Sequence, residues 1–326
     1  MKKSLMTLGV LALFVLMAYG QEKKFALYSV AFYNMENLFD TIHDEGKNDY
    51  EYLPNGTNQW NTMKYKAKLK NMSEILSMLS TDKLPMGPAI IGVSEIENYR
   101  VLEDILKQPV LADRGYQYVH YEGADQRGVD CAFFYNPKLF ELTNSKLVPY
   151  VYINDTVHKT RGFLIASGNI AGEKMHFIVN HWPSRAAASP ARERAGEQVR
   201  AIKDSLLRED SAAKIVIMGD MNDDPMDKSM AVALGAKRKP ADVGPTDLYN
   251  PWWDTLKKGY GTLMYKGKWN LFDQIVFTGN LLGTDRSTLK FYKHEIFRRD
   301  FMFQKEGKYK GYPKRTQAGG VWLNGY

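Results

Sequence analysis

Short apolar runs that end abruptly on polar residues are the feature of this 326-residue chain that most restricts its fold. The run IVIMG at residues 215–219 is followed by four acids and amides within five positions, and then by Pro225. Similar runs of strand length occupy residues 25–34, 89–96, 129–136, 174–182 and 271–279. Short apolar runs bounded by turn residues are typical of buried β-strands. The chain is therefore expected to contain buried β-sheets.

Two segments between these runs show helical patterns. In residues 63–80, apolar side chains recur at three- and four-residue spacing, which predicts an amphipathic helix. They are Tyr65, Leu69, Met72, Ile75, Leu76 and Leu79. A second helix is predicted from Ser189, as its N-cap, and Pro190, at its first position, to about Leu207. Alternating strands and helices, without a linker-like segment, predict a single α/β domain over residues 21–326, in which the polar segment 41–61 is a loop.

Residues 1–20 have the features of a secretory signal peptide. Two lysines precede an apolar run over residues 5–18, and the small-residue ending AYG precedes Gln21. An uncleaved anchor helix is the alternative for this segment. The lone Cys131 excludes an intramolecular disulfide, which is compatible with a bacterial periplasmic or secreted protein. Cleavage before Gln21 would remove two lysines and lower the formal net charge from +7 to +5, a balance that suits a polyanionic substrate.

Polar side chains recur where the predicted strands end or begin. They are Asn34, Glu95, His181, Asp220, Asn222 and Asp273. In α/β sheets, the ends of strands and the loops beyond them are common places for functional sites. Asp220 and Asn222 lie two residues apart, so an extended segment would place both side chains on one face. Each residue alone also has a structural explanation, such as a solvated acid for Glu95 or a core histidine for His181. Their combined spacing and order favours a functional site.

Several motifs together resemble the endonuclease/exonuclease/phosphatase superfamily, which includes the deoxyribonucleases. They read FYNMENLF, GVSEIEN, RGVDCAFFY, VNHWPSR, GDMND and LFDQIVF, and they span residues 32–277. The first motif is similar to the NMENLFD of exported bacterial members. The resemblance implies a four-layer α/β sandwich, with two packed mixed β-sheets flanked by helices. It also implies hydrolysis of phosphate esters by in-line attack of an activated water, with a divalent cation that neutralises the developing charge.

The resemblance assigns roles to individual residues. Glu95 matches the metal-binding glutamate, and Asn34 matches the asparagine that supports the metal and the phosphate. Asp220 matches the aspartate that orients or activates the attacking water, and Asn222 the amide that contacts the phosphate. Mg²⁺, with Mn²⁺ as the alternative, prefers such oxygen ligands, and the sequence has no cysteine/histidine zinc cluster.

Four further residues complete the predicted site. His181 matches a histidine that contacts the phosphate and helps the leaving group, and Asp273 matches an aspartate that supports the site. Arg127 and Arg185 are predicted phosphate contacts, because a guanidinium group matches phosphate oxygens in a bidentate way.

One family motif is absent from the sequence. Members normally end with a Ser-Asp-His motif that completes the metal site and the acid/base pair, and this sequence stops at Tyr326 without it. We therefore expect a sequence truncated before this motif and before a last core strand. The alternative expectation is a non-catalytic protein that binds phosphate or nucleic acid.

The substrate is less constrained than the chemistry. Residues 286–326 carry ten Lys/Arg against three Asp/Glu, and residues 249–272 contain seven aromatic residues. A basic, aromatic surface could bind DNA or RNA, whereas the same residues could also form a solvated surface and a packed loop. The sequence therefore favours a monomeric nuclease or phosphodiesterase. A phosphatase or a sphingomyelinase-like phospholipase is the alternative.

Overall fold

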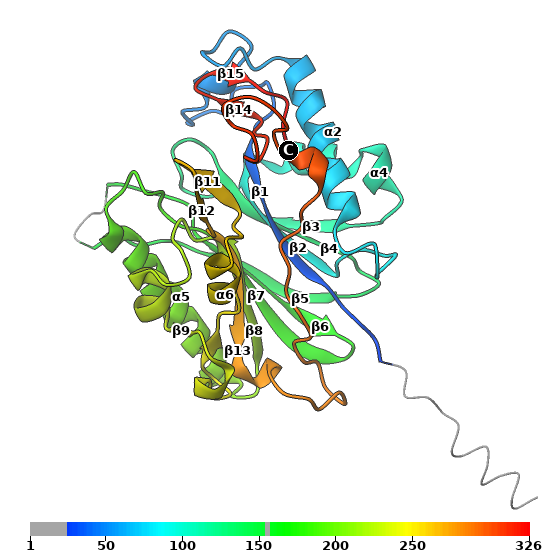
Figure 1. Cartoon of the computed structure of the whole chain (residues 1–326), viewed down its shortest axis with the longest axis vertical. Helices are drawn as coiled ribbons and strands as arrows, with labels where there is room; N and C mark the ends of the chain where they lie inside the picture. The colour runs from blue at the N-terminus through cyan, green and yellow to red at the C-terminus, as the bar shows by residue number, and fades with distance from the viewer. Residues whose placement is uncertain (1–24, 154–156) are drawn as a thin grey trace, which may run out of the picture.

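The computed structural model describes residues 25–153 and 157–326, so the predicted signal peptide at 1–20 lies outside the described residues. Two β-sheets dominate the described part of the chain (Figure 1). The first has four strands in the order β1-β2-β4-β3, at Val30–Leu38, Ile90–Ile96, Asp130–Tyr135 and Gln117–His120. The second has seven strands in the order β5-β6-β7-β8-β13-β10-β9, at Glu141–Val148, Phe163–Ile170, Glu173–His181, Lys214–Asp220, Asp273–Thr278, Leu248–Tyr249 and Ala236–Lys237.

Alternating side chains give each sheet two apolar faces. In β2, Ile90 packs in the cluster between the two sheets, whereas Ile91 packs in the cluster that contains the first helix. In β8, Met218 packs between the sheets and Ile217 packs on the opposite side. This period-two alternation means that each sheet needs a covering layer on its outer face.

Helices supply the two outer layers (Figure 1). On the first sheet lie α2 at Thr62–Met78, α3 at Tyr99–Leu106 and α4 at Pro109–Ala112. On the second sheet lies α5 at Ser189–Glu209, which packs through Ala195 and Val199. The order is therefore helix, sheet, sheet, helix, and the predicted four-layer α/β sandwich is confirmed.

The remaining described elements are short. They are 3₁₀ turns at Tyr50–Tyr52, Pro240–Asp242, Gly279–Leu281 and Asp300–Met302, a π-helical segment at Ser229–Leu234, α6 at Trp252–Lys257, the hairpin of β11 at Leu263–Tyr265 and β12 at Lys268–Asn270, and the hairpin of β14 at Gln317–Ala318 and β15 at Val321–Trp322. Among the described residues, every helix is too short or too polar to cross a membrane.

Some elements differ from the sequence-based expectation. The first strand lies at Val30–Leu38 rather than 25–34, because its parallel pairing with β2 resumes beyond an irregularity after Asn34. The N-cap of α5 is Ala188, and Ser189 lies within the helix, where its hydroxyl donates to Glu193 Oε1 at 3.2 Å. The polar strand β5, whose residues are exposed or half-buried, has no apolar run that would predict it.

The topology carries strand ends from both sheets to one rim. β1 runs parallel to β2, and β7 runs parallel to β8. His181 at the end of β7 is in register with Asp220 at the end of β8. Asp273, at the start of the antiparallel β13, is in register with the same Asp220. Four of the six predicted rim residues, Asn34, His181, Asp220 and Asp273, therefore arrive there as the first or last residues of paired strand segments. Glu95 lies at the register shift between Ser94 and Ile96.

Candidate active site

Asn34 joins the two sheets at this rim. Its Nδ2 donates to Glu95 Oε1 on β2 at 3.2 Å and to Asp220 Oδ2 on β8 at 3.0 Å. Its Oδ1 accepts the backbone N–H of Glu36 at 2.7 Å, which fixes the orientation of the amide. One side chain thus holds together a carboxylate from each sheet.

Glu95 lies on a backbone irregularity near the end of β2. Its φ is +60°, in the left-handed region that non-glycine residues rarely adopt, and the register of β2 with β4 shifts there. Its Oε2 accepts the N–H of Asn37 at 2.7 Å, and the φ of Asn37 is +57°. Strained residues of this kind concentrate at functional sites, and here the irregularity directs the Glu95 carboxylate into the rim.

Gly219 allows the end of β8 to approach β7 closely. A Cβ built on Gly219 would lie 2.2 Å from the carbonyl oxygen of Asn180. A side chain at this position would therefore push the two strands apart. The glycine of the GDMND motif has a packing explanation, because it lets β8 place Asp220 beside His181.

Asn222 does not share an extended face with Asp220, so that expectation is wrong. β8 ends at Asp220, and Asn222 has a φ of +52°. The N–H of Asn222 donates to Asp220 Oδ1 at 2.9 Å, which closes a tight turn of the Asx type. The Nδ2 of Asn222 donates to the carbonyl oxygen of Trp182 at 3.0 Å. The turn nevertheless keeps Asn222 next to Asp220 at the rim.

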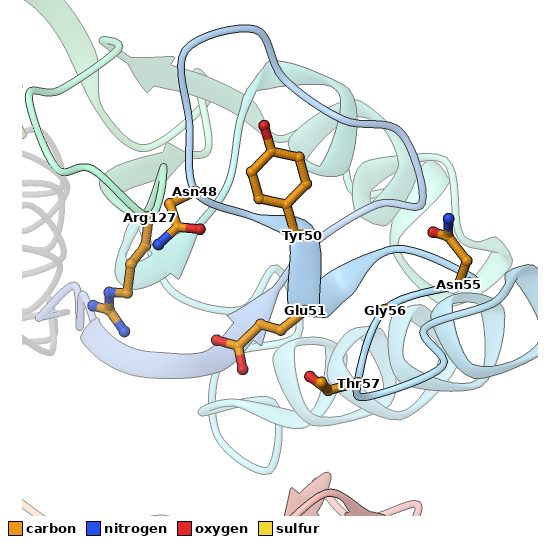
Figure 2. Close-up of a pocket in the computed structure, with 7 residues that line it drawn as sticks. All are labelled: Asn48, Tyr50, Glu51, Asn55, Gly56, Thr57 and Arg127. Carbon is orange, nitrogen blue, oxygen red and sulfur yellow. The ribbon is translucent and has the colours of Figure 1, made fainter.

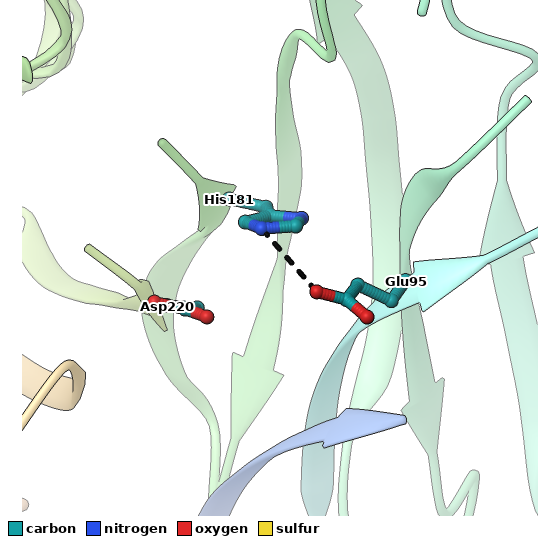
Figure 3. Close-up of side chains that lie close together, drawn as sticks. All are labelled: Glu95, His181 and Asp220. Carbon is teal, nitrogen blue, oxygen red and sulfur yellow. Dashed lines mark ion pairs between the residues drawn. The ribbon is translucent and has the colours of Figure 1, made fainter. Parts of the chain in front are cut away.

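The donor atoms at the rim fit a divalent cation. One donor atom each from Glu95, His181 and Asp220 lie within 4.8 Å of one another (Figure 3). His181 Nε2 lies 3.7 Å from Glu95 Oε1, which is too far for a hydrogen bond. Asp273 Oδ1 and His181 Nδ1 are buried and have no hydrogen-bond partner among the described residues. The carboxylates of Glu95 and Asp220 are oxygen ligands of the kind that Mg²⁺ and Mn²⁺ prefer, and His181 lies beside them.

The buried acids at the rim have raised pKa values. Burial, followed by repulsion from Asp220, raises the pKa of Asp273 to about 8. Burial, followed by repulsion from Glu95, raises the pKa of Asp220 to about 6. Burial, with the charges of Arg161 and Arg127, lowers the pKa of His181 well below its usual value, so the ring is neutral at pH 7. A dication at the rim would favour the ionised carboxylates.

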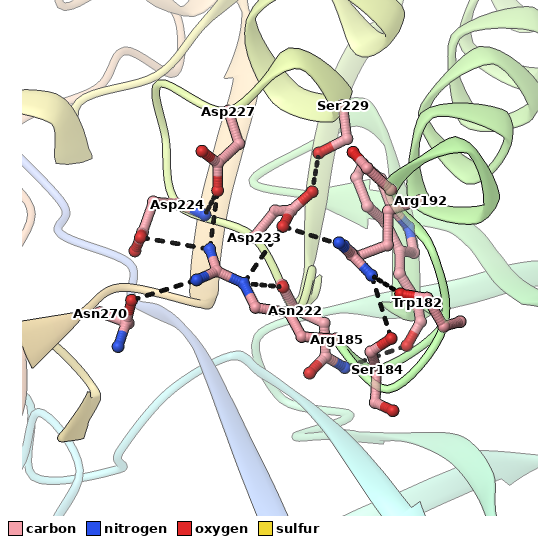
Figure 4. A network of polar contacts seen from close by, with 12 residues as sticks. Trp182, Ser184, Arg185, Arg192, Asn222, Asp223, Asp224, Asp227, Ser229 and Asn270 are labelled. Atoms are coloured by element: carbon pink, nitrogen blue, oxygen red, sulfur yellow. Dashed lines mark hydrogen bonds and ion pairs between the residues drawn. The ribbon is translucent and has the colours of Figure 1, made fainter. Parts of the chain in front are cut away.

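Arg185 binds the acidic loop that follows β8 (Figure 4). Its Nη2 lies 2.7 Å from Asp227 Oδ2 and 3.3 Å from Asp224 Oδ2, and its Nε donates to the carbonyl oxygen of Asn222 at 3.1 Å. Its guanidinium also lies over the ring of Phe272, 4.4 Å from the centroid. The structure brings Arg185 to the edge of the rim, and its contact with phosphate stays a prediction.

Arg127 lies on the loop between β3 and β4. It lines a pocket of about 510 Å³ together with residues of the predicted loop 41–61 (Figure 2). Those residues are Asn48, Tyr50, Glu51, Asn55, Gly56 and Thr57. The side chain of Arg127 is 46% exposed, so its charge is accessible to an anionic ligand, and its phosphate contact also stays a prediction.

Arg161 is a residue near the rim that the sequence did not predict. Its side chain is only 8% exposed, and its Nη1 donates to Asp125 Oδ2 at 3.1 Å. Its Nη2 donates to the carbonyl oxygen of Trp182 at 2.8 Å, next to His181. Its Nε is buried without a hydrogen-bond partner among the described residues. A single arginine before a strand gives no local signal of burial, because arginine is usually exposed.

Comparisons with known proteins agree with this fold. The model of the family described as "Endonuclease/Exonuclease/phosphatase family" matches residues 29–326. Curated proteins give no significant match. Among solved structures, humanized D. rerio TDP2 with 14 mutations has a TM-score of 0.50 at 15% identity, over 77% of this chain and 83% of that chain. ANGEL2, a 2',3'-cyclic phosphatase, has a TM-score of 0.50 at 11% identity, over 66% of this chain and 74% of that chain. At such identities the likeness shows a shared fold.

Proposed function

The chain belongs to the endonuclease/exonuclease/phosphatase family, and from this premise we propose that it is an exported, divalent-metal-dependent phosphoester hydrolase. The substrate we propose is a phosphodiester of nucleic acid. Glu95 and Asn34 are the residues that would hold Mg²⁺ or Mn²⁺, with Asp220 and His181 beside them. The apolar run over residues 5–18 supports export. Fractionation of bacteria that express the full chain tests export, and a protein confined to the cytoplasm would contradict it. Sequencing the N-terminus of the exported protein then tests cleavage before Gln21.

The observation that carries the hydrolase proposal is the pair of carboxylates held by Asn34. Glu95 and Asp220 come from different sheets and accept hydrogen bonds from one amide nitrogen. Burial, followed by repulsion from Glu95, raises the pKa of Asp220, so a cation bound between the two carboxylates would relieve this repulsion. When bound there, a divalent cation neutralises the negative charge that develops on a phosphate during hydrolysis.

The chain's own residues would position the phosphate and move the proton. Asp220, with a pKa of about 6, is mostly ionised at pH 7 and accepts a proton from the attacking water. Asn222 keeps one amide hydrogen after its bond to Trp182, and this hydrogen can be donated to a phosphate oxygen. His181 is neutral, so it presents an N–H to the phosphate without first gaining a proton.

A basic and aromatic surface beside the rim supports nucleic acid as the substrate. We define this surface as the β11–β12 hairpin together with residues 303–315. The two parts are adjacent, since a Cβ built on Gly267 lies 3.9 Å from the Tyr312 hydroxyl. Exposed Tyr265 and Tyr309 offer rings on which bases can stack. Lysines interleave with these rings at positions 266, 268, 305, 308, 310 and 314.

This surface continues directly into the rim. The β12 strand ends at Asn270, whose side chain lies 3.4 Å from Arg185, and Asp273 follows three residues later. On the other side, Arg315 pairs with Glu36 at 2.6 Å, and Glu36 also bonds to Asn34. A bound strand could therefore follow the lysines toward the carboxylates.

Matched substrates test the proposed function. Hydrolysis of a phosphodiester, bis(p-nitrophenyl) phosphate, is compared with hydrolysis of the monoester, of a single-stranded oligonucleotide and of sphingomyelin, each with Mg²⁺ or EDTA. We expect Mg²⁺-dependent cleavage of the diester and the oligonucleotide. Faster cleavage of the monoester or of sphingomyelin would identify a phosphatase or a phospholipase instead. Oligonucleotide binding without cleavage of any ester would support a non-catalytic binding protein.

Cation binding is expected to release protons near neutral pH. With a pKa of about 8, Asp273 is mostly protonated at pH 7, and a dication favours its ionised form. Binding should therefore release roughly one proton at pH 7 and almost none at pH 9, and affinity should weaken as the pH falls below 8. Calorimetric Mg²⁺ titrations in buffers of different ionisation enthalpy count these protons. In Asp273→Asn, the side chain at position 273 has no proton to release. Unchanged proton release in this variant would therefore refute Asp273 as the source of the proton.

A further inference from the structure

We propose that His120, Glu122 and Asp130 form a second divalent-cation site, a zinc site with three protein ligands at the base of the β3–β4 hairpin. It goes beyond the proposed hydrolysis and does not depend on it. His120 ends β3, Asp130 begins β4, and Glu122 lies in the loop between them. One donor atom from each of the three lies within 4.8 Å of the other two.

The cluster lies at the same end of the first sheet as the active-site rim, since Asp130 is registered with Ile96 next to Glu95, but it lies on the helix-covered face of that sheet. His120 is two residues from Tyr118, which packs on the helix-covered face of the first sheet. Asp130 is likewise two residues from Ala132, which is registered with His120 and packs on that same face. Cys131 packs on the opposite face, in the cluster between the two sheets. Because alternate residues share a face, His120 and Asp130 lie on the outer side of the sheet.

The spacing of the donor atoms fits zinc better than it fits a hydrogen bond. His120 Nε2 lies 3.4 Å from Asp130 Oδ2. Ligands at about 2.0–2.1 Å from a tetrahedral zinc ion lie about 3.3–3.4 Å apart. An N–H···O hydrogen bond usually joins atoms about 2.9–3.0 Å apart. The imidazole and the carboxylate therefore already stand at the separation of two ligands on one ion.

A buried nitrogen without a hydrogen-bond partner, His120 Nε2, is evidence for a metal ligand that is separate from the donor-atom spacing. His120 Nε2 is buried and has no hydrogen-bond partner among the described residues, and the His120 side chain is 5% exposed. It faces Asp130, whose side chain is 4% exposed. Asp130 Oδ2 accepts the N–H of Gly123 at 3.0 Å, and such a second hydrogen bond orients a carboxylate ligand. Coordination would satisfy the nitrogen that the protein leaves unpaired.

The local charges also favour a dication. Lys47 Nζ lies 3.9 Å from Glu122 Oε2, and it also donates to the carbonyl oxygens of Gly123 at 3.0 Å and Asp125 at 3.4 Å. The single positive charge of Lys47 therefore does not neutralise the two carboxylates of Glu122 and Asp130. Glu122 is 55% exposed, so it can turn to a metal without repacking the core. The bound ion would tie together the two ends of loop 121–129, which carries Arg127.

Zinc titration of the full chain tests the proposal. The chelator-treated protein is titrated with Zn²⁺ by calorimetry and with Co²⁺ by visible absorption, in a Glu95→Gln background that disables the rim site. We expect one equivalent of metal to bind in Glu95→Gln, with the intense absorption of tetrahedral Co²⁺. Adding Glu122→Gln should weaken Zn²⁺ binding by at least about 100-fold, because even changes to outer partners of metal ligands cost about 10–100-fold.

Glu306→Gln is the matched control, because Glu306 is an exposed glutamate outside the proposed site. Added to Glu95→Gln, it should leave Zn²⁺ affinity unchanged. Zn²⁺ should raise the melting temperature of this control but not that of the variant with Glu122→Gln. Absence of Zn²⁺ binding in Glu95→Gln, or equal affinities in the two double variants, would overturn the proposal and leave His120 and Asp130 as a simple contact pair.

Discussion

Glu95→Gln is expected to weaken Mg²⁺ binding at the rim strongly and to remove most of the Mg²⁺-dependent hydrolysis. The substitution keeps the shape of the side chain and an oxygen that can accept the Asn37 N–H, but it removes the charge that holds the cation. Mg²⁺ is usually held by only one or two carboxylates, so the loss of one should weaken binding strongly. We expect at least about 100-fold weaker Mg²⁺ binding, since changes to outer partners alone cost about 10–100-fold. Calorimetry measures binding, and oligonucleotide cleavage measures activity.

Glu97→Gln is the matched control for this prediction. Glu97 is two residues away and buried, and burial raises its pKa to about 9, so it is already neutral at pH 7. Its replacement by a neutral amide should therefore leave Mg²⁺ binding nearly unchanged. Our assignment of Glu95 would be refuted by wild-type binding in Glu95→Gln, or by an equal loss in Glu97→Gln.

Asp125→Ala is expected to destabilise the fold by about 3–5 kcal/mol, the usual cost of removing one partner of a buried ion pair. Asp125 Oδ2 accepts hydrogen bonds from Arg161 at 3.1 Å and Thr160 at 3.3 Å. Its Oδ1 accepts the N–H of Arg127 at 3.0 Å. Truncation would leave the Arg161 guanidinium buried without its counter-charge. Urea denaturation measures the free energy of unfolding.

A second substitution separates the ion pair from the other contacts of Asp125. In Asp125→Ala/Arg161→Met no unpaired charge remains, so part of the lost stability should return. The part that does not return reports the hydrogen bonds to Thr160 and the loop backbone. If the double variant is less stable than Asp125→Ala, the buried charge of Arg161 is not the cause of the loss.

Local patterns explain why most of the sandwich could be predicted. The apolar face of α2 was identified from spacing alone, and its members Leu69, Met72 and Ile75 are buried as expected. Strand ends could be identified in the same way, because a buried strand and the polar residue that ends it are neighbours in the chain. This local pattern predicts Glu95 and Asp220 as rim residues, and the packing of the two sheets, bridged by Asn34, brings them together.

Interactions between distant segments explain what could not be predicted. Lys68 lies in α2 among apolar positions, yet it is fully buried, and burial lowers its pKa to about 8. It donates to the carbonyl oxygen of Glu36 at 2.8 Å and to Thr316 Oγ1 at 2.7 Å, 248 residues away. Arg161 likewise depends on Asp125, 36 residues earlier. Local hydrophobic patterns cannot identify such pairs, because neither residue of a pair stands out from the residues next to it in the sequence.

Because of the Asn34 bridge, the geometry of the proposed active site depends on the alignment of the two sheets. One amide spans both sheets, so any sliding of one sheet over the other changes the separation of Glu95 and Asp220 directly. That alignment is set by inter-sheet packing, as between the rings of Phe133 and Phe177, whose centroids lie 5.9 Å apart. Repacking this layer can shift one sheet relative to the other while the chain stays folded, because cores lose rigidity before they lose stability. Variants with a repacked inter-sheet layer would then be folded and soluble but would cleave substrate poorly.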